Sequence, residues 1–251
     1  SPLIPRELVL TGAADYVELP MHLDYAFTAF TLEAWIKPAA AGQGTIVARE
    51  VGAGLFNYKF ELTAAGKLSL TYHDQLGIAK TVTSVLAIPA MDGKTWTHVA
   101  VAFGPAAAGQ PNSVAFYING QNALVYAPGV SLVAAPRTVA DVAPAAYIGK
   151  GMIGSVFELR MWNAVRSATD IQLNYNTELA ANDRAGLVGW FRFDDVYDAA
   201  AKGKVENFAK PQDWLTGWQF AGDTTNAWLN AATLVNATVD ATDEAPVSDI
   251  D

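Results

Sequence analysis

The alternation of apolar and polar side chains is clearest over residues 151–176, where it predicts a strand followed by a short helix. One side of the expected strand is purely apolar and should face a core; it holds Phe157, Leu159 and Met161. The opposite side combines a charged pair with a large aromatic ring; it holds Val156, Glu158, Arg160 and Trp162. Because Glu158 and Arg160 are two residues apart, we expect a salt bridge between them, with Glu33 as a further candidate partner.

The strand pattern stops at Asn163 and gives way to a helical one. Ser167 stands three residues before Asp170, which is the spacing of a capping box with Asp in place of the usual Glu or Gln. Ile171 and Tyr175 are four residues apart and would form the buried stripe of a helix of about two turns. We therefore expect a short helix that begins near Ser167 and lies against the body of the protein.

Short apolar or alternating segments of strand length recur along the chain as far as Phe193. They occupy residues 8–10, 16–20, 31–38, 45–48, 56–62, 67–73, 78–88, 95–103, 114–118, 147–149 and 187–193. Asn119-Gly120 predicts a tight hairpin turn, because both residues tolerate positive φ. Residues 127–144 contain three prolines and scattered apolar residues, which predicts a long loop.

About a dozen short strands and one helix predict an all-β fold, a two-sheet antiparallel jelly-roll sandwich with one short helix. We expect this domain to occupy residues 1–198. Residues 199–251 include large aromatic side chains that are too apolar for a free tail. We expect this segment to form an extension that packs on the domain and ends in an acidic tail; the alternative is the opening of a second copy of the domain.

Several of these segments together resemble a known family. They are the run from Gly154 to Ile171 and the segments at 12–20, 31–38, 96–100, 117–120 and 186–194. Taken in chain order, these segments are similar to the motifs of bacterial laminin G-like domains, which belong to the concanavalin A-like lectin and glucanase superfamily. The resemblance implies a sandwich fold and a choice among lectin, glycosidase, adhesion and pentraxin functions, because one fold hosts many activities.

The composition excludes several classes of protein. The chain has 251 residues, of which 51% are hydrophobic and 16% charged, so it can bury a large core. Its formal net charge is −9, and five acidic residues between 237 and 251 carry more than half of that charge. The sequence shows no basic stripe, which argues against a nucleic-acid partner. It has no apolar run of membrane-spanning length, so we expect no membrane insertion.

The 251 residues include no cysteine, which rules out disulfides and thiol chemistry. Animal laminin G-like domains usually carry a disulfide, so the resemblance favours a bacterial source. The first residues, Ser1 to Pro5, do not read as a signal peptide. We expect a secreted or cell-surface protein whose signal was removed, or a module of a longer chain.

The candidate chemistry does not favour an enzyme. Glucanases of this superfamily carry two or three carboxylates alternating on one strand, whereas Glu158 stands alone beside Arg160, which would hold it ionised. The three histidines, His22, His73 and His98, are scattered without metal-ligand spacing. We expect His98 to be a packed, hydrogen-bonded residue rather than a catalytic one.

The resemblance implies a possible Ca²⁺ site built from carboxylates and loop carbonyls, with Asp15, Asp194 and Asp195 as candidate ligands. It also implies that the first strand pairs with the strand at 187–193, which would bring these residues together. The alternative is that Asp15 caps a turn.

We expect a non-catalytic binding module that recognises glycans, since lectin sites combine aromatic platforms with hydrogen-bonding groups. The candidate platform residues lie on strands and would reach an exposed sheet face; they are Trp35, Tyr58, Tyr72 and Tyr117. For each one the alternative is that it covers an edge of the core. The alternative function is a protein–protein adhesion or structural module of a larger secreted or toxin-like protein, with a cell-surface protein as its partner.

Overall fold

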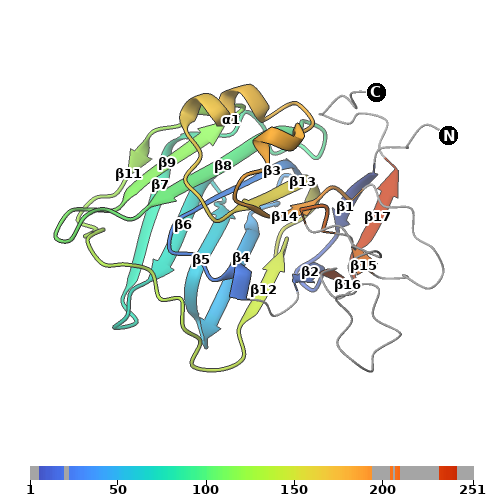
Figure 1. The fold of residues 1–251 in the computed structure, drawn as a ribbon. Helices are drawn as coiled ribbons and strands as arrows, with labels where there is room; N and C mark the ends of the chain where they lie inside the picture. Colours follow the sequence, from blue (N-terminus) through green and yellow to red (C-terminus); the bar gives the residue numbers. More distant parts are fainter. Residues whose placement is uncertain (1–5, 20–22, 194–203, 206, 210–231, 242–251) are drawn as a thin grey trace.

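The computed structural model describes residues 6–19, 23–193, 204–205, 207–209 and 232–241. Within these residues the chain forms two sheets packed face to face with one α-helix over one of them (Figure 1). All paired strands run antiparallel, apart from one isolated parallel bridge. The prediction of a two-sheet antiparallel sandwich with one short helix is confirmed.

The first sheet has eight described strands. In spatial order they are β10 (Gln121–Asn122), β9 (Ser113–Ile118), β8 (Thr97–Gly104), β3 (Phe30–Pro38), β13 (Gly154–Trp162), β1 (Arg6–Leu10) and β17 (Thr238–Ala241), with β14 (Leu187–Phe191) paired to β13. The strand β14 therefore pairs with β13 and not with β1, so the expected pairing of the first strand with residues 187–193 is wrong.

The second sheet has nine described strands. In spatial order they are β11 (Val125–Tyr126), β7 (Ala79–Ala87), β6 (Lys67–His73), β5 (Leu55–Leu62), β4 (Gly44–Gly52), β12 (Ala145–Ile148), β2 (Tyr16–Leu19), β16 (Ala232–Val235) and β15 (Lys204–Val205). The expected loop at 127–144 connects β11 to β12, from one edge of this sheet to its middle.

The main core lies between the two sheets. Alternate residues of each strand point into it, for example Leu32, Ala34 and Ile36 from β3. Three residues of β5 do the same from the other sheet; they are Tyr58, Phe60 and Leu62. Such alternating faces are what two packed antiparallel sheets require, because each sheet buries one face.

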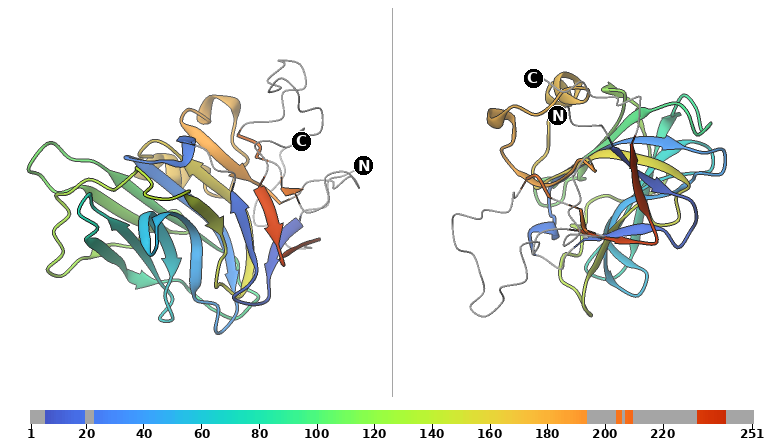
Figure 2. Two further views of the ribbon diagram at one scale, coloured as in Figure 1. Left: turned by 90° about the horizontal axis from the view of Figure 1, so that it is seen from below. Right: turned by 90° about the vertical axis from the view of Figure 1, so that its right-hand side faces the viewer.

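Helix α1 (Ala168–Asn174) lies on the outer face of the eight-stranded sheet, away from the nine-stranded one (Figures 1 and 2). Ser167 caps it: its hydroxyl accepts from Asp170 N at 3.1 Å while the Asp170 carboxylate accepts from Ser167, as a capping box requires. Ile171 is buried against the sheet, so the expected start and buried face of the helix are confirmed. The turn between β9 and β10 places Asn119 and Gly120 at positive φ, as expected.

The described residues beyond 198 extend both sheets. The strand β17 pairs with β1 in one sheet, and β16 pairs with β2 in the other. The expected domain boundary at residue 198, and most of the aromatic residues of the extension, lie outside the described residues. In the described part of the chain, no helix has the length and apolar character needed to cross a bilayer.

Candidate functional site

The four aromatic residues expected to form a platform are all buried. Tyr58 and Tyr72 are fully buried in the core between the sheets, in phase with their apolar neighbours. Trp35 and Tyr117 point to the outer face of the eight-stranded sheet but are only 7% and 5% exposed. The prediction of an exposed platform built from these residues is wrong.

Helix α1 and the residues after it cover Trp35 and Tyr117. Ile171 packs on Tyr117, and Tyr175 at the end of the helix packs on Trp35 with ring centroids 5.9 Å apart. The Trp35 indole N–H also donates to the Tyr175 carbonyl oxygen at 2.9 Å. These contacts cover the outward sides of both Trp35 and Tyr117. They therefore hold the helix in place and leave neither ring open as a platform for a ligand.

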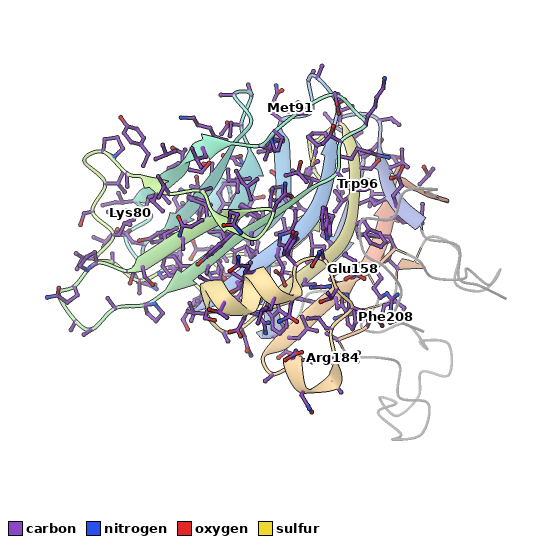
Figure 3. The ribbon with its side chains drawn as sticks, turned by 90° about the horizontal axis from the view of Figure 1, so that it is seen from above. Lys80, Met91, Trp96, Glu158, Arg184 and Phe208 are labelled. Atoms are coloured by element: carbon purple, nitrogen blue, oxygen red, sulfur yellow. The ribbon has the colours of Figure 1, made fainter. Side chains whose placement is uncertain are left out.

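A buried polar network lies on the same outer face, beside the end of helix α1 (Figure 3). Glu33 accepts from the Trp162 indole at 2.9 Å and lies 3.8 Å from Arg160 Nη1 and 3.5 Å from His98 Nε2. Glu158 lies 3.0 Å from Arg160 Nη2 and accepts from the Trp190 indole at 2.8 Å. The expected Glu158–Arg160 salt bridge, with Glu33 as a further partner, is confirmed.

A β-bulge in β13 builds this network. Phe157 pairs with Trp35, and Arg160 pairs with Glu33. On β3 one residue separates Trp35 from Glu33, whereas on β13 two residues, Glu158 and Leu159, fill the same interval. Glu158 takes up the extra residue at φ 50°. The bulge shifts the alternation: Val156 joins the core while Phe157 faces the helix side, so the expected placement of these two residues is wrong.

The electrostatics of the network fit an ion-pair cluster that is closed to substrates. Burial by itself raises the pKa of Glu33, but the His98 hydrogen bond, the charge of Arg160 and the Trp162 indole outweigh it and hold that pKa at about 2. Burial lowers the pKa of His98, against the opposing effect of Glu33. Glu33 and Glu158 are each only 3% exposed, so neither carboxylate can reach a sugar without opening the fold.

Asp15 closes the turn before β2. Its Oδ2 accepts from Thr11 N at 2.7 Å, Thr11 Oγ1 at 2.8 Å and Gly12 N at 3.2 Å. The Thr11 hydrogen bonds lower the pKa of Asp15. Asp194 and Asp195 lie outside the described residues. Within the described part, no three carboxylate, histidine or cysteine side chains gather to hold a metal ion, so Asp15 by itself does not make a calcium site.

The outer face of the nine-stranded sheet is the candidate ligand surface. Two rows of outward side chains cross its strands in register, and their members are mostly hydroxyl-bearing or charged. The first row is Thr81, Thr71, Lys59, Ala48, Tyr147 and Glu18; the second is Tyr126, Thr83, Ser69, Glu61 and Thr45. Neighbouring strands are about 4.8 Å apart, so the first row, from β7 to β2, spans about 24 Å.

One end of this face carries an aromatic corner made of Tyr16, Tyr147 and Lys150. The two tyrosine rings meet edge to face with centroids 6.3 Å apart, and Lys150 Nζ lies 5.0 Å and 4.6 Å from their centroids. Tyr16 is partly exposed and Lys150 is exposed, whereas Tyr147 is only 7% exposed, so Tyr16 provides the ring face of the corner and Tyr147 supports it. Burial, with the nearby Glu50 and Glu61 carboxylates, raises the pKa of Tyr147 to about 12, so its hydroxyl remains a hydrogen-bond donor at neutral pH.

The sequence interpretation did not select this corner. Tyr16 alternates with the core residues Val17 and Leu19, and Tyr147 alternates with Ala146 and Ile148. The sequence alone therefore indicates that both tyrosines face away from the core. What the chain could not provide was the pairing of β2 with β12, which places the two tyrosines side by side.

The arrangement defines a lectin-like sandwich with one helix-covered sheet and one polar, aromatic-edged sheet face. The sequence profile of the concanavalin A-like lectin/glucanases superfamily (Laminin_G_3) matches residues 11–172. The chain belongs to this superfamily. No match was found among curated protein sequences.

Solved structures share the fold. A proposed carbohydrate-binding protein from Bacteroides ovatus is 16% identical with a TM-score of 0.61, over 98% of this chain and 62% of that one. This chain therefore spans about three fifths of that protein. The heptameric SAP-like pentraxin of Limulus polyphemus is 15% identical with a TM-score of 0.40, over 68% of this chain and 76% of that one. The binding domain of Paraclostridial Mosquitocidal Protein 1 is 12% identical with a TM-score of 0.41, over 66% and 46%.

Proposed function

We propose that this protein is a non-catalytic module that binds glycans on the outer face of its nine-stranded sheet. The observation that carries the proposal is the Tyr16–Tyr147–Lys150 corner beside two rows of hydroxyl and charged side chains. The superfamily and the B. ovatus likeness support the same class of ligand. A glycan ligand fits a secreted or cell-surface protein, which we propose for this chain as well.

The chemistry of the face suits sugars. A sugar ring has an apolar face, which an exposed tyrosine ring can cover, and hydroxyls that need hydrogen-bond partners at its edge. Tyr16 provides the ring, and Glu18, two residues further along β2, provides an acceptor on the same face. Thr71 lies on β6, four strands away, and offers a hydroxyl to an extended glycan. We expect binding through several modest contacts rather than through one deep pocket.

The proposal is non-catalytic because Glu33 and Glu158, the two carboxylates that flank Arg160, serve the buried network. Both carboxylates lie against Arg160 and are buried, and the low pKa of Glu33 removes one candidate for the protonated acid that glycoside hydrolysis needs. Release of reducing sugar from a β-glucan, abolished by Glu158→Gln, would contradict this part of the proposal.

A glycan array probed with the intact protein tests the function, with and without Ca²⁺. We expect binding to a defined set of glycans, weakened at least tenfold by Tyr16→Ala. The matched control is Leu173→Ala, which removes an exposed apolar side chain from helix α1 on the opposite sheet and should leave binding unchanged. An array without any bound glycan, or equal losses in both variants, would contradict the proposal.

One observation favours a protein partner instead. The loops at one rim of the sandwich expose apolar side chains, with Leu76 84% and Val139 71% exposed. Exposed apolar groups mark protein interaction sites when they gather on one surface. Binding to a cell-surface protein that Leu76→Asp abolishes and Tyr16→Ala spares would support this second function.

A further inference from the structure

Tyr126 is an exposed aromatic residue at the edge of the nine-stranded sheet. It lies on β11 and is 57% exposed, and among the described residues nothing hydrogen-bonds to its side chain or stacks on its ring. It pairs with Thr83 of β7 and points to the outer face of the sheet, whereas its neighbour Val125 packs against the core. The ring is therefore open to a ligand on the same face as the aromatic corner.

The strand pairing places Tyr126 and Tyr16 at opposite ends of one row of outward side chains. From β11 to β4 the cross-strand neighbours in this row are Tyr126, Thr83, Ser69, Glu61 and Thr45. The row continues to the corner, because Thr45 N donates to the Lys150 carbonyl oxygen at 3.1 Å and Lys150 Nζ lies 5.0 Å from the Tyr16 ring centroid. Six strand spacings separate β11 from β2, so the two tyrosines are about 29 Å apart.

The middle of the row is polar. Thr83, Ser69 and Thr45 carry short hydroxyl-bearing side chains, and the last two are only 1% and 5% exposed, so they form a floor and do not themselves reach a ligand. Glu61 and Lys59 form a salt bridge beside this floor, with side chains 24% and 27% exposed. A polar surface with an aromatic ring at each end suits a chain of sugars, because the rings cover apolar sugar faces and the polar groups meet hydroxyls between them.

We propose that the ligand of this face is an extended, linear polysaccharide that crosses the strands from Tyr16 to Tyr126. This inference rests on the proposed function and adds the length and the direction of the ligand. A sugar ring is about as wide as the spacing between strands, so a chain that reaches both tyrosines has about six rings. Such a chain gains affinity over a shorter one, because its second contact is intramolecular once the first has formed.

Calorimetric titration of the whole protein tests the length, with cello-, xylo- and manno-oligosaccharides of two, four and six units as probes. We expect the affinity to rise at least tenfold between two and six units in a series that binds. Equal affinity for all lengths would overturn this inference and leave the proposed function intact. So would a protein that binds none of these chains but binds a branched or terminal glycan on the array. Absence of binding in all three series and on the array would overturn both.

Variants assign the two ends of the chain. Tyr126→Ala should lower the affinity for the six-unit chain about tenfold, as the loss of one ring contact predicts, and should leave the two-unit chain, bound at the aromatic corner, unchanged. Tyr126→Phe keeps the ring and should retain most of the affinity, whereas Tyr16→Ala should weaken every length. Leu173→Ala, at a similarly exposed residue over the opposite sheet, is the control and should bind all chains as the native protein does. Unchanged affinity of Tyr126→Ala for the six-unit chain would overturn the inference.

Discussion

The indole N–H of Trp162 donates a 2.9 Å hydrogen bond to Glu33 Oε1, joining residues 129 positions apart on neighbouring strands. This contact ties the end of β13 to the middle of β3. Glu33 is buried and charged, so each hydrogen-bond donor or positive charge beside it stabilises the folded state. The buried charged residues of β3 and β13, Glu33 and Arg160, thus stabilise the fold.

Replacing Arg160 should strongly destabilise the protein. Arg160→Met would leave Glu33 and Glu158 buried without their shared cation and would remove hydrogen bonds to the Asn174 and Thr177 carbonyls. We expect a loss of about 3–5 kcal/mol in the free energy of unfolding, measured with urea. Lys94→Met, at an exposed position, is the control and should change it by less than about 0.5 kcal/mol. A loss below about 1 kcal/mol in Arg160→Met would contradict this account.

Stability should fall in acid from about pH 6.5 downwards. The pKa of His98 is lowered by burial, so the unfolded chain takes up its proton first as the pH falls below 6.5. The Glu33 pKa is depressed from 4.5 to about 2, so its stabilisation is complete above pH 4.5 and is lost as the pH falls towards 2. Urea unfolding at a series of pH values measures this.

His98→Gln should flatten the first part of that decline. It should not remove it entirely, because burial also lowers the pKa of His73. Stability that rises between pH 6.5 and 5 would show that His98 is not held neutral in the folded protein.

Asp15 should matter with or without calcium. Asp15→Ala removes three hydrogen bonds that close the turn before β2, so the melting temperature should fall even in chelator. If Asp15, Asp194 and Asp195 also hold Ca²⁺, as we propose, millimolar Ca²⁺ should raise the melting temperature of the native chain. That rise should disappear in Asp194→Ala and in Asp15→Ala, and equal melting temperatures in calcium and chelator would remove the calcium site.

The helix cap should be measurable on its own. Ser167→Ala removes the hydroxyl that accepts from Asp170 N, so we expect the free energy of unfolding to fall by about 1 kcal/mol. Ser167→Thr keeps the hydroxyl that accepts from Asp170 N and donates to its carboxylate, and should retain most of the stability. Unfolding monitored by intrinsic tryptophan fluorescence would report the change, because Trp35 lies under the helix end.

The local pattern of the sequence was sufficient for the helix and for the longer strands, whereas five short strands, β10, β11, β15, β16 and β17, were not predicted. Strand phases such as Leu32, Ala34 and Ile36, the Asn119-Gly120 turn and the Ser167 cap are set by neighbouring residues, so they could be predicted before any contact was known. The Glu158–Arg160 pair was predictable for the same reason, since two residues separated by one on a strand lie on one face.

The burial of the aromatic residues and the choice of site depended on tertiary structure. Alternation says that Trp35 and Tyr117 face away from the core, but only the packing of Ile171 and Tyr175 covers them. The bulge at Glu158 changes the phase of β13 without a signal in the local sequence, because its cause is the register with β3. Likewise Tyr16 meets Tyr147, and Tyr126 joins the row that ends at Tyr16, through strand pairings between distant segments. Sequence periodicity fixes which side of a strand each residue occupies, while long-range pairing decides what that side meets and whether it stays open.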